Sequence, residues 1–548
     1  MSRSHQIAVN AVSQWGVTIL GSALGLMLVP FLIAKLGKDG YGLIAVTMAI
    51  AGVCALADLG ISGALGRQLS EALATGNKAQ YSQLASTAFA LNLLMGLASA
   101  LAVFFSAGRL ASFFALPASL AGTGVFLIRT YGAAPVLFTF LTPAAKAVLA
   151  SHNRFDTSSQ IDAVRRLVET TGLFVVLAST GAGIAGWAMI CIAADAVSTL
   201  LLWRAAAKTH AGLRVAASSI RLSSARELFG LGGQFTLLQL GGQLSVNADP
   251  FILTSCLGPA SLSLYRPPAQ VFTSMAPLVS TLANQLHPLA TKAHVAGDKK
   301  DLTAILLRGT RYTMLMGAVF CALVISLADP LCEVWLGKAL GGQHAICATL
   351  LKIQALTNLG VFAAGTQWPL LLGMKRTAFA AYGRLALAVL NIAASWLLLR
   401  YTDLGVVGVI LPTMAIELAW RPLLAHYVCR VLGIRVADYF RASYWRPLLS
   451  GSLVAVAGFS IALAVRLNTI ERLAIAALFL TGIGALSAWS IGLSQPERRS
   501  SLNSLRPLLV LRPPGPLPYG RGSVPARNRA RQQADETDHT VEDLGALR

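Results

Sequence analysis

Long apolar stretches recur along almost the whole chain, and this feature limits the fold more than any other. Each stretch is about 20 residues long, the length that an α-helix needs to cross the hydrocarbon core of a bilayer. Hydrophobic residues make up 55% of the 548 residues and charged residues only 12%, which excludes an ordinary soluble globular surface. The sequence therefore predicts an all-α polytopic membrane protein.

The apolar stretches divide into about fourteen predicted transmembrane helices. The first stretch, Ile7–Ala34, is longer than the core of a signal peptide and is predicted to be a retained helix. The predicted spans are residues 8–33, 42–65, 83–106, 123–145, 163–182, 184–203, 229–256, 264–287, 304–328, 346–372, 377–399, 404–429, 447–465 and 473–493.

Lysine and arginine are concentrated in every second predicted loop. The loops after the even-numbered helices carry most of them, for example Arg204 and Lys208, whereas the other loops carry few, such as Arg109. Because loops rich in lysine and arginine stay in the cytoplasm, both termini are predicted to be cytoplasmic. The net charge of +21 is spread over these loops rather than gathered on one face, so no nucleic acid is expected as a partner.

Two short motifs recur in the two halves of the chain with the same displacement. Pro30–Gly37 (PFLIAKLG) ends the first predicted helix, and Pro250–Gly258 (PFILTSCLG) ends the seventh. After the next helix in each half, Gly76–Lys78 (GNK) corresponds to Gly297–Lys299 (GDK). The repeat predicts two pseudo-symmetric six-helix lobes related by an axis along the membrane normal, with a central cavity between them.

The repeat divides the chain into five predicted parts. The last part is rich in proline and arginine, cannot bury a core, and is predicted to be a disordered cytoplasmic tail. The parts are a six-helix lobe (1–205), a cytoplasmic linker (206–228), a second six-helix lobe (229–435), an extra pair of helices (436–493) and the tail (494–548).

The segments around the first two helices resemble a known family. Leu36–Gly42 (LGKDGYG) follows the first helix, and Asp58–Ile61 (DLGI) with Ala64–Arg67 (ALGR) closes the second. With six plus six plus two helices, the chain resembles the polysaccharide-synthesis flippases of the multidrug, oligosaccharidyl-lipid and polysaccharide exporter superfamily over about residues 1–493. The turn at Pro259–Ser263 departs from the Tyr-Gly turn of the first lobe.

This resemblance implies a flippase of the inner membrane that moves polyprenyl-diphosphate-linked oligosaccharides by alternating access. These precursors would serve the O-antigen of lipopolysaccharide, a capsule or an exopolysaccharide, and the implied partners are the lipid-linked oligosaccharide, membrane lipids and other polysaccharide-assembly proteins. A multidrug exporter and a peptidoglycan-precursor flippase are the alternatives. The sequence has no P-loop, no paired metal-binding carboxylate motif and no Gly-x-Ser-x-Gly elbow, so no enzyme activity, catalytic residue, cofactor or metal is expected.

Four cationic residues fall within or at the start of predicted helices, namely Arg129, Lys352, Arg421 and Arg266. A charge near the centre of a membrane helix costs about 2.5–3.5 kcal/mol on insertion scales, so these residues are predicted to line a wet cavity that binds the diphosphate. Snorkelling to a membrane surface is the alternative for Arg129 and Lys352. For Arg421, an ion pair with Glu417 one turn away is favoured over phosphate binding.

Polar residues also follow one face of the first and seventh predicted helices. Such faces line a sugar-accepting cavity or allow close helix packing, and their matched position in the two lobes favours the cavity. The predicted sugar-contacting residues are Asn10, Gln14, Gln239 and Gln243. Asp58 and Asp249 are candidates for coupling to a proton or cation, with a capping role as the alternative for Asp58 and a helix break at Pro250 for Asp249.

Overall fold

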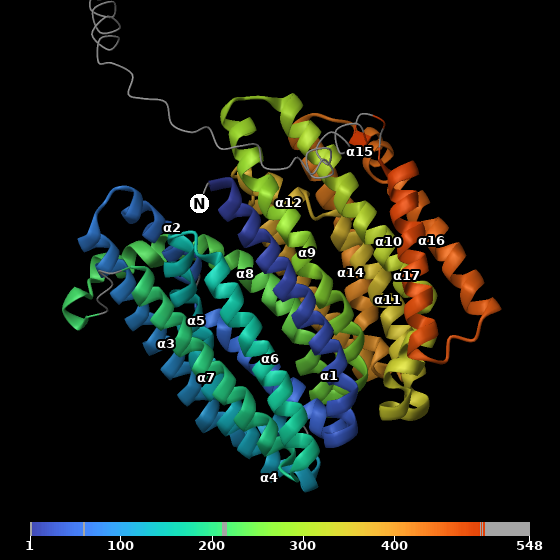
Figure 1. The fold of residues 1–548 in the computed structure, drawn as a ribbon, viewed down its shortest axis with the longest axis horizontal. Coiled ribbons are helices and arrows are strands. Elements are labelled where there is room, and N and C mark those ends of the chain that lie inside the picture. Colours follow the sequence, from blue (N-terminus) through green and yellow to red (C-terminus); the bar gives the residue numbers. More distant parts are fainter. Residues whose placement is uncertain are drawn as a thin grey trace, which may run out of the picture. The chain divides into compact units, whose positions relative to one another are not determined.

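The computed structural model describes residues 3–58, 61–114, 116–210 and 216–493, together with Gln495, Glu497 and Arg498. Side chains are described within these ranges except at residues 3–15, 230–246 and 276–285 and at positions 56, 63, 118, 217 and 288. The described residues form helices joined by short turns, without a β-strand (Figure 1). The predicted all-α polytopic fold is therefore confirmed.

Seventeen α-helices follow one another along the described residues. The first seven are α1 (Arg3–Cys54), α2 (Ile61–Ala74), α3 (Lys78–Phe113), α4 (Ala118–Leu127), α5 (Ala134–Ser151), α6 (Phe155–Ser179) and α7 (Gly183–Thr209). The next seven are α8 (Leu222–Leu257), α9 (Ser261–Val295), α10 (Lys299–Leu340), α11 (His344–Ala363), α12 (Gln367–Gly373), α13 (Ala378–Tyr401) and α14 (Val407–Leu432). The last three are α15 (Val436–Ser443), α16 (Trp445–Ala464) and α17 (Ile470–Ser487).

Every predicted span overlaps one or more of these helices. α1 contains the first predicted span and the beginning of the second, and Gly37 breaks the helix between them with a backbone (φ 75°, ψ 171°) that favours glycine. Among the described residues, nine helical segments are long and apolar enough to cross a membrane, and one of them, Lys299–Gly373, runs through three helices. The chain is therefore a multi-pass membrane protein, and the count of about fourteen spans stays a prediction.

The two repeated motifs have the same backbone conformation in both halves. Gly37 has φ 75° and ψ 171°, and its counterpart Gly258 has φ 77° and ψ 172°. The second pair of motifs forms matching helix caps, since Asn77 Oδ1 accepts a hydrogen bond from the Gln80 amide at 3.0 Å and Asp298 Oδ1 accepts one from the Asp301 amide at 2.9 Å. The sequence repeat therefore corresponds to a local structural repeat.

The helices of each half pack mainly on one another. Helices α2, α3, α5 and α7 form one group, and α9–α14 form a second group on which α16 and α17 pack through α10 (Figure 1). Helix α1 lies between the groups and contacts both α6 and α9. The exact lobe boundaries stay a prediction.

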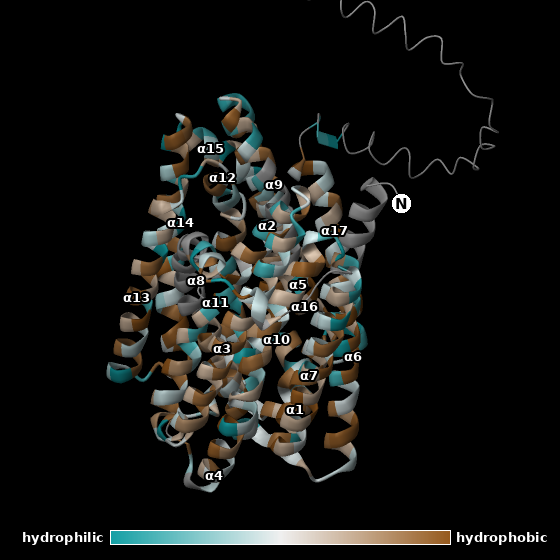
Figure 2. Ribbon diagram, turned by 90° about the vertical axis from the view of Figure 1, so that its left-hand side faces the viewer, coloured by the Kyte–Doolittle hydropathy of each residue, from teal (hydrophilic) through white to brown (hydrophobic). Residues whose placement is uncertain are grey.

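Large apolar side chains point outward along many helices. Figure 2 shows hydrophobic residues over much of the length of the helices. Phe105, Leu463 and Leu478 are 77%, 89% and 76% exposed, which would be unfavourable in water but suits contact with lipid chains.

The two halves are joined at the end that carries the lysine-poor loops, here called the outer end. One apolar core includes residues of both halves there, whereas two further cores are separate, one mainly on α2, α3 and α5 and one mainly on α10, α12 and α14. Across the joined end, Lys38 Nζ donates to Gln343 Oε1 at 2.6 Å and Trp335 Nε1 donates to the Leu26 carbonyl at 2.9 Å. The protein is thus closed at its outer end.

A close backbone contact also belongs to this closure. A Cβ atom placed on Gly42, in the second half of α1, would lie 1.8 Å from the carbonyl oxygen of Pro259, in the turn between α8 and α9. Because no real Cβ atom approaches an oxygen so closely, only glycine allows this packing.

Two histidines tie the opposite, inner ends of α3, α5 and α7 together. His210 stacks on Tyr81 with ring centroids 4.2 Å apart, and its Nδ1 lies 3.2 Å from Nε2 of His152. Partial burial, together with the neighbouring His152 and Lys78, lowers the pKa of His210 below its usual value of 6.5. This packing therefore favours neutral His210.

Candidate functional site

A cavity of about 1010 Å³ lies between the two halves, among α1, α2, α5, α6, α7 and α9. Its walls carry hydroxyl groups from several helices, including Thr18, Ser62, Thr139, Thr142 and Ser158. Such groups both donate and accept hydrogen bonds, so the cavity has the chemistry to hold a polar ligand inside an apolar helix bundle.

Helix α1 contributes a face of small residues to this cavity. A Cβ atom on Gly21 would lie 3.9 Å from Arg166 Nε, and one on Gly25 would lie 3.5 Å from Gln270 Nε2. Ser22, between these glycines, donates from its hydroxyl to the Ser274 carbonyl of α9 at 3.3 Å. The small face therefore leaves room for long polar side chains from α6 and α9.

Helix α6 presents four charged residues along one face. Asp162, Arg165, Arg166 and Glu169 are spaced by three and four residues, which places them on the same side of a helix. With an axial rise of 1.5 Å per residue, this face extends roughly 10–20 Å from the start of α6 at its inner end. The charges therefore lie about two to four turns along α6 from its inner end.

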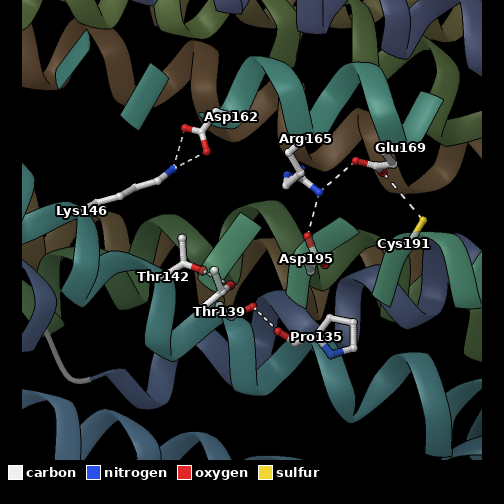
Figure 3. A network of polar contacts seen from close by, with 10 residues as sticks. Pro135, Thr139, Thr142, Lys146, Asp162, Arg165, Glu169, Cys191 and Asp195 are labelled. Carbon is white, nitrogen blue, oxygen red and sulfur yellow. Dashed lines mark hydrogen bonds and ion pairs between the residues drawn. The ribbon is translucent and has the colours of Figure 1, made fainter. Parts of the chain in front are cut away.

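Two ion pairs join this face to the neighbouring helices (Figure 3). Lys146 of α5 contacts both carboxylate oxygens of Asp162, at 2.7 and 2.9 Å. Arg165 donates to Asp195 of α7 at 2.7 Å and to Glu169, one turn along α6, at 2.9 Å. These contacts bridge three helices and fix the position of two cations on the cavity wall.

Arg166 differs from these two cations. It lies on the cavity wall with an exposed side chain, and it has no ion pair or hydrogen bond to any residue within the described part of the chain. A guanidinium group has five donors in a planar fork that matches phosphate or carboxylate oxygens. Arg166 is therefore the cation that is available to an anionic ligand.

A second polar cluster is buried in the other half, around Asp249. Asp249 is only 2% exposed. Tyr265 Oη donates to its Oδ2 at 2.7 Å, and Asn391 Nδ2 donates to its Oδ1 at 3.3 Å. Thr413 Oγ1 in turn donates to Asn391 Oδ1 at 3.1 Å. Hydrogen-bond donors from α9 and α13 thus converge on one buried carboxylate of α8, and Thr413 of α14 donates to the α13 residue.

Comparison with known proteins assigns the chain to a family and agrees with the helical fold. A family model described as "Polysaccharide biosynthesis protein" matches residues 34–340, which is more than half of the chain. The chain belongs to this polysaccharide biosynthesis family. The chain is also similar to the uncharacterized membrane protein EpsK of Bacillus subtilis (strain 168). The two are 22% identical over 350 residues, which cover 64% of this chain and 68% of EpsK.

Solved structures show that this family member has the fold of two groups of transporters. The lipid II flippase MurJ, in an inward closed conformation, matches with a TM-score of 0.66 and 16% identity over 92% of this chain and 100% of MurJ. An inward-facing multidrug resistance transporter of the MATE family, MOP superfamily, matches with a TM-score of 0.65 and 10% identity over 77% of this chain and 99% of its own. The family match confirms the predicted resemblance to polysaccharide-synthesis proteins, and the solved structures show the same fold.

The predicted cationic residues of this family member lie away from the large cavity. Arg129 lies over the Phe104 ring, 5.6 Å from its centroid, and Lys352 pairs with Asp329 at 2.6 Å. Arg129 thus has a cation–π contact and Lys352 an ion pair, each with a residue outside the cavity lining. Arg266 is half-buried near the start of α9 and also lies outside the cavity lining.

Arg421 pairs with Glu417, as the spacing of four residues indicated. Glu417 also accepts a hydrogen bond from Arg384 of α13 at 3.4 Å, so this carboxylate serves two arginines of the same half. The pairing explains why Arg421 tolerates burial, because its charge is largely balanced inside the protein. In the described residues, the cations on the cavity wall are Lys146, Arg165 and Arg166 instead.

The remaining predicted site residues have different outcomes. The side chains of Asn10, Gln14, Gln239 and Gln243 lie outside the described residues. Asp58 accepts hydrogen bonds from Ser62 Oγ at 2.7 Å and from the Ser62 amide at 3.3 Å, which is a cap at the start of α2. Asp249 lies in the buried cluster described above.

The sequence analysis missed the charged face of α6 because Arg165 and Arg166 lie at the very start of the predicted span 163–182, where basic residues usually belong to the cytoplasmic edge of a helix. In the structure, α6 begins at Phe155 and continues without a break into the apolar part. The spacing of Asp162, Arg165, Arg166 and Glu169 was the signal, because charges at three- and four-residue intervals mark one helix face rather than a loop.

Proposed function

We propose that this protein is a flippase for polyprenyl-diphosphate-linked oligosaccharides, the precursors of a surface polysaccharide such as O-antigen, capsule or exopolysaccharide. In this proposal it acts in the inner membrane, with both termini in the cytoplasm, beside the other proteins of polysaccharide assembly. The observation that carries the proposal is Arg166, an arginine on the wall of a large polar cavity that has no counter-ion within ion-pair distance among the described residues. A diphosphate supplies that counter-ion.

The cavity suits both parts of such a headgroup. Its volume of about 1010 Å³ is at the upper end of the usual range for small-molecule sites, which leaves room for sugar units beside the phosphates. Hydroxyl-bearing side chains of α1, α5 and α6 match sugar hydroxyls, and Arg166 matches phosphate oxygens. The apolar outer surface of the helices leaves the polyprenyl chain in the bilayer.

The composition of the walls favours this proposal over export of cationic drugs. A cavity for cationic amphiphiles should carry an excess of carboxylates and several aromatic rings. The described lining has three cations against two carboxylates, Asp162 and Asp195, and its aromatic rings are Phe138 and Phe155. A peptidoglycan-precursor flippase needs the same cation chemistry and remains the second candidate, with the fold of MurJ in its favour.

Closure at one end supports alternating access as the mechanism. The contacts between Lys38 and Gln343 and between Gly42 and Pro259 close the outer end, while the apolar cores of the two halves are separate towards the inner end. The cavity wall on α6 starts near that inner end. A headgroup then enters from the cytoplasmic side, and rocking of the two halves exposes it to the other side.

Translocation in vesicles tests the proposed function. We expect reconstituted protein to move a fluorescent polyprenyl-diphosphate disaccharide to the opposite leaflet much faster than protein-free vesicles do, because the cavity replaces the headgroup's hydration. The same vesicles should not accumulate ethidium, a cationic dye. Ethidium transport without movement of the lipid-linked sugar would assign the protein to drug export, and faster movement of a pentapeptide-bearing precursor would assign it to peptidoglycan synthesis.

Asp249 is the proposed coupling residue. It is a buried carboxylate that accepts hydrogen bonds from Tyr265 and Asn391, and a buried ionisable group in a membrane helix is a candidate for binding a proton or a small cation. We expect Asp249→Asn to slow gradient-driven translocation by about one to two orders of magnitude, because the amide cannot bind the driving ion.

The measurement for Asp249 is the translocation rate with and without an imposed sodium or proton gradient. The matched control is Asp329→Asn, which removes a carboxylate that is 68% exposed and paired with Lys352 outside both polar sites. An Asp249→Asn protein that still accelerates in the gradient as much as the wild type would remove Asp249 from this role.

A further inference from the structure

Two of the three cations on the cavity wall already have counter-ions from the protein itself. Lys146 is paired with Asp162 and Arg165 with Asp195, in both cases at 2.7 Å. Asp162 and Asp195 both line the cavity, so these carboxylates stand where an incoming anion would bind. The unloaded site thus already contains two competing anions.

The charge balance makes simple addition of a diphosphate unfavourable. The charged groups of the described network are three cations and three carboxylates, counting Glu169 behind the wall. A headgroup with two or more negative charges would be repelled by carboxylates that are still held at the wall, and this repulsion is strong where little water screens it. An anion can bind tightly only if it replaces the carboxylates at their cations.

The geometry allows such a replacement. The side chains of Lys146 and Asp162 are 38% and 33% exposed, so the pair meets the water of the cavity and contributes little net stability. Asp162 can turn into that water when it is displaced. Arg165 keeps a second partner, because Glu169 holds it at 2.9 Å from the same helix and does not line the cavity.

We propose that Asp162 and Asp195 are exchangeable counter-ions: the anionic headgroup displaces them from Lys146 and Arg165 on binding, and their return expels the headgroup on release. This inference rests on the proposed function and assigns the residues that control release. Arg166 makes the first contact because it has no ion pair with any described residue, and Lys146 and Arg165 follow as their ion pairs open. Glu169 keeps Arg165 in place throughout.

Substitution by the isosteric amide tests the exchange. We expect Asp162→Asn and Asp195→Asn to bind farnesyl diphosphate roughly 3- to 10-fold more tightly than the wild type, since each change removes one weak competing ion pair. Release should slow by a similar factor, so both variants should translocate a fluorescent polyprenyl-diphosphate disaccharide more slowly. Binding is measured by titration calorimetry on the full chain in detergent, and translocation in vesicles.

Matched controls separate exchange from other effects of the charge. Asp156→Asn, on the same helix, removes a carboxylate that pairs with Arg154 at 3.3 Å outside the cavity lining, and its affinity should be unchanged. Asp162→Glu restores an anion and should bind like the wild type. In a Lys146→Gln background, Asp162→Asn should give no gain in affinity, because there is no longer a cation to release.

The outcomes distinguish this inference from the proposed function. If the wild type neither binds farnesyl diphosphate nor moves the lipid-linked sugar, the proposed function itself fails. If the wild type does both but Asp162→Asn and Asp195→Asn bind no more tightly, only the exchange fails. If Asp162→Asn still raises the affinity for farnesyl diphosphate in the Lys146→Gln background, Asp162 acts only by long-range electrostatic repulsion of the ligand. That result also overturns the exchange.

Discussion

Replacement of Gly42 by leucine should abolish translocation, with a loss of at least about 100-fold, or roughly 3 kcal/mol in the barrier. The carbonyl oxygen of Pro259 lies only 1.8 Å from the place of the new Cβ atom, and it is a backbone atom of the turn between α8 and α9 rather than the end of a flexible side chain. The outer end then cannot close. Because both halves must meet there in one state of the cycle, the protein should fold but remain unable to complete a cycle.

Native cysteines report whether the outer end is open. Cys332 and Cys347 are buried in the apolar core that joins the two halves, and neither is exposed to solvent. In a background that lacks the exposed Cys256, a membrane-impermeant maleimide should label Gly42→Leu much faster than the wild type. Gly108→Leu on α3 is the control, because a side chain there meets open space. Wild-type labelling together with wild-type translocation in Gly42→Leu would contradict the role of this contact.

Charge reversal at Arg166 should weaken the binding of farnesyl diphosphate by about 10- to 100-fold, the effect of losing a charge-assisted hydrogen bond worth about 1.5–3 kcal/mol. Arg166→Glu also adds a third carboxylate to the wall, so repulsion should increase the loss. Thermal stability should change little, because Arg166 has no ion pair within the described residues that the substitution could break.

Two further variants sharpen the test of Arg166. Arg166→Lys keeps the charge but not the planar fork of donors, and should retain part of the affinity. Arg154→Gln, at the start of α6, removes an arginine that is 48% exposed and outside the cavity lining, and should bind like the wild type. Equal affinities for wild type and Arg166→Glu would remove Arg166 from the binding site and with it the main support for the proposed function.

The fold followed from local sequence patterns. Apolar stretches of membrane-spanning length predicted helices that the structure contains, because the need to satisfy backbone hydrogen bonds in lipid leaves little other choice. The motif repeat could also be recognised from the sequence. Its two glycines, Gly37 and Gly258, are conformationally equivalent, since both adopt a positive φ that other residues rarely reach. Glu417 and Arg421, four residues apart on one helix, were also correctly paired.

The proposed binding site could not be predicted in the same way. Single cations in apolar stretches, such as Arg129 and Lys352, stood out in the sequence, but partners on neighbouring segments satisfy them locally. Lys146 and Arg166 stood out less, because they lie near the ends of predicted spans, where lysine and arginine are common. What distinguishes Arg166 is the absence of a partner among the described residues, a property of packing rather than of spacing.

The sequence by itself determined that this chain crosses a membrane many times as helices, that two motifs recur in its two halves and that it resembles a family of polysaccharide biosynthesis proteins. These properties depend on hydropathy and on local backbone geometry, which residues close in the chain specify. Only the tertiary structure decided which cations face the cavity, which carboxylates neutralise them and which end is closed. Those properties depend on contacts between distant helices, as between Lys38 and Gln343, and no local pattern encodes them.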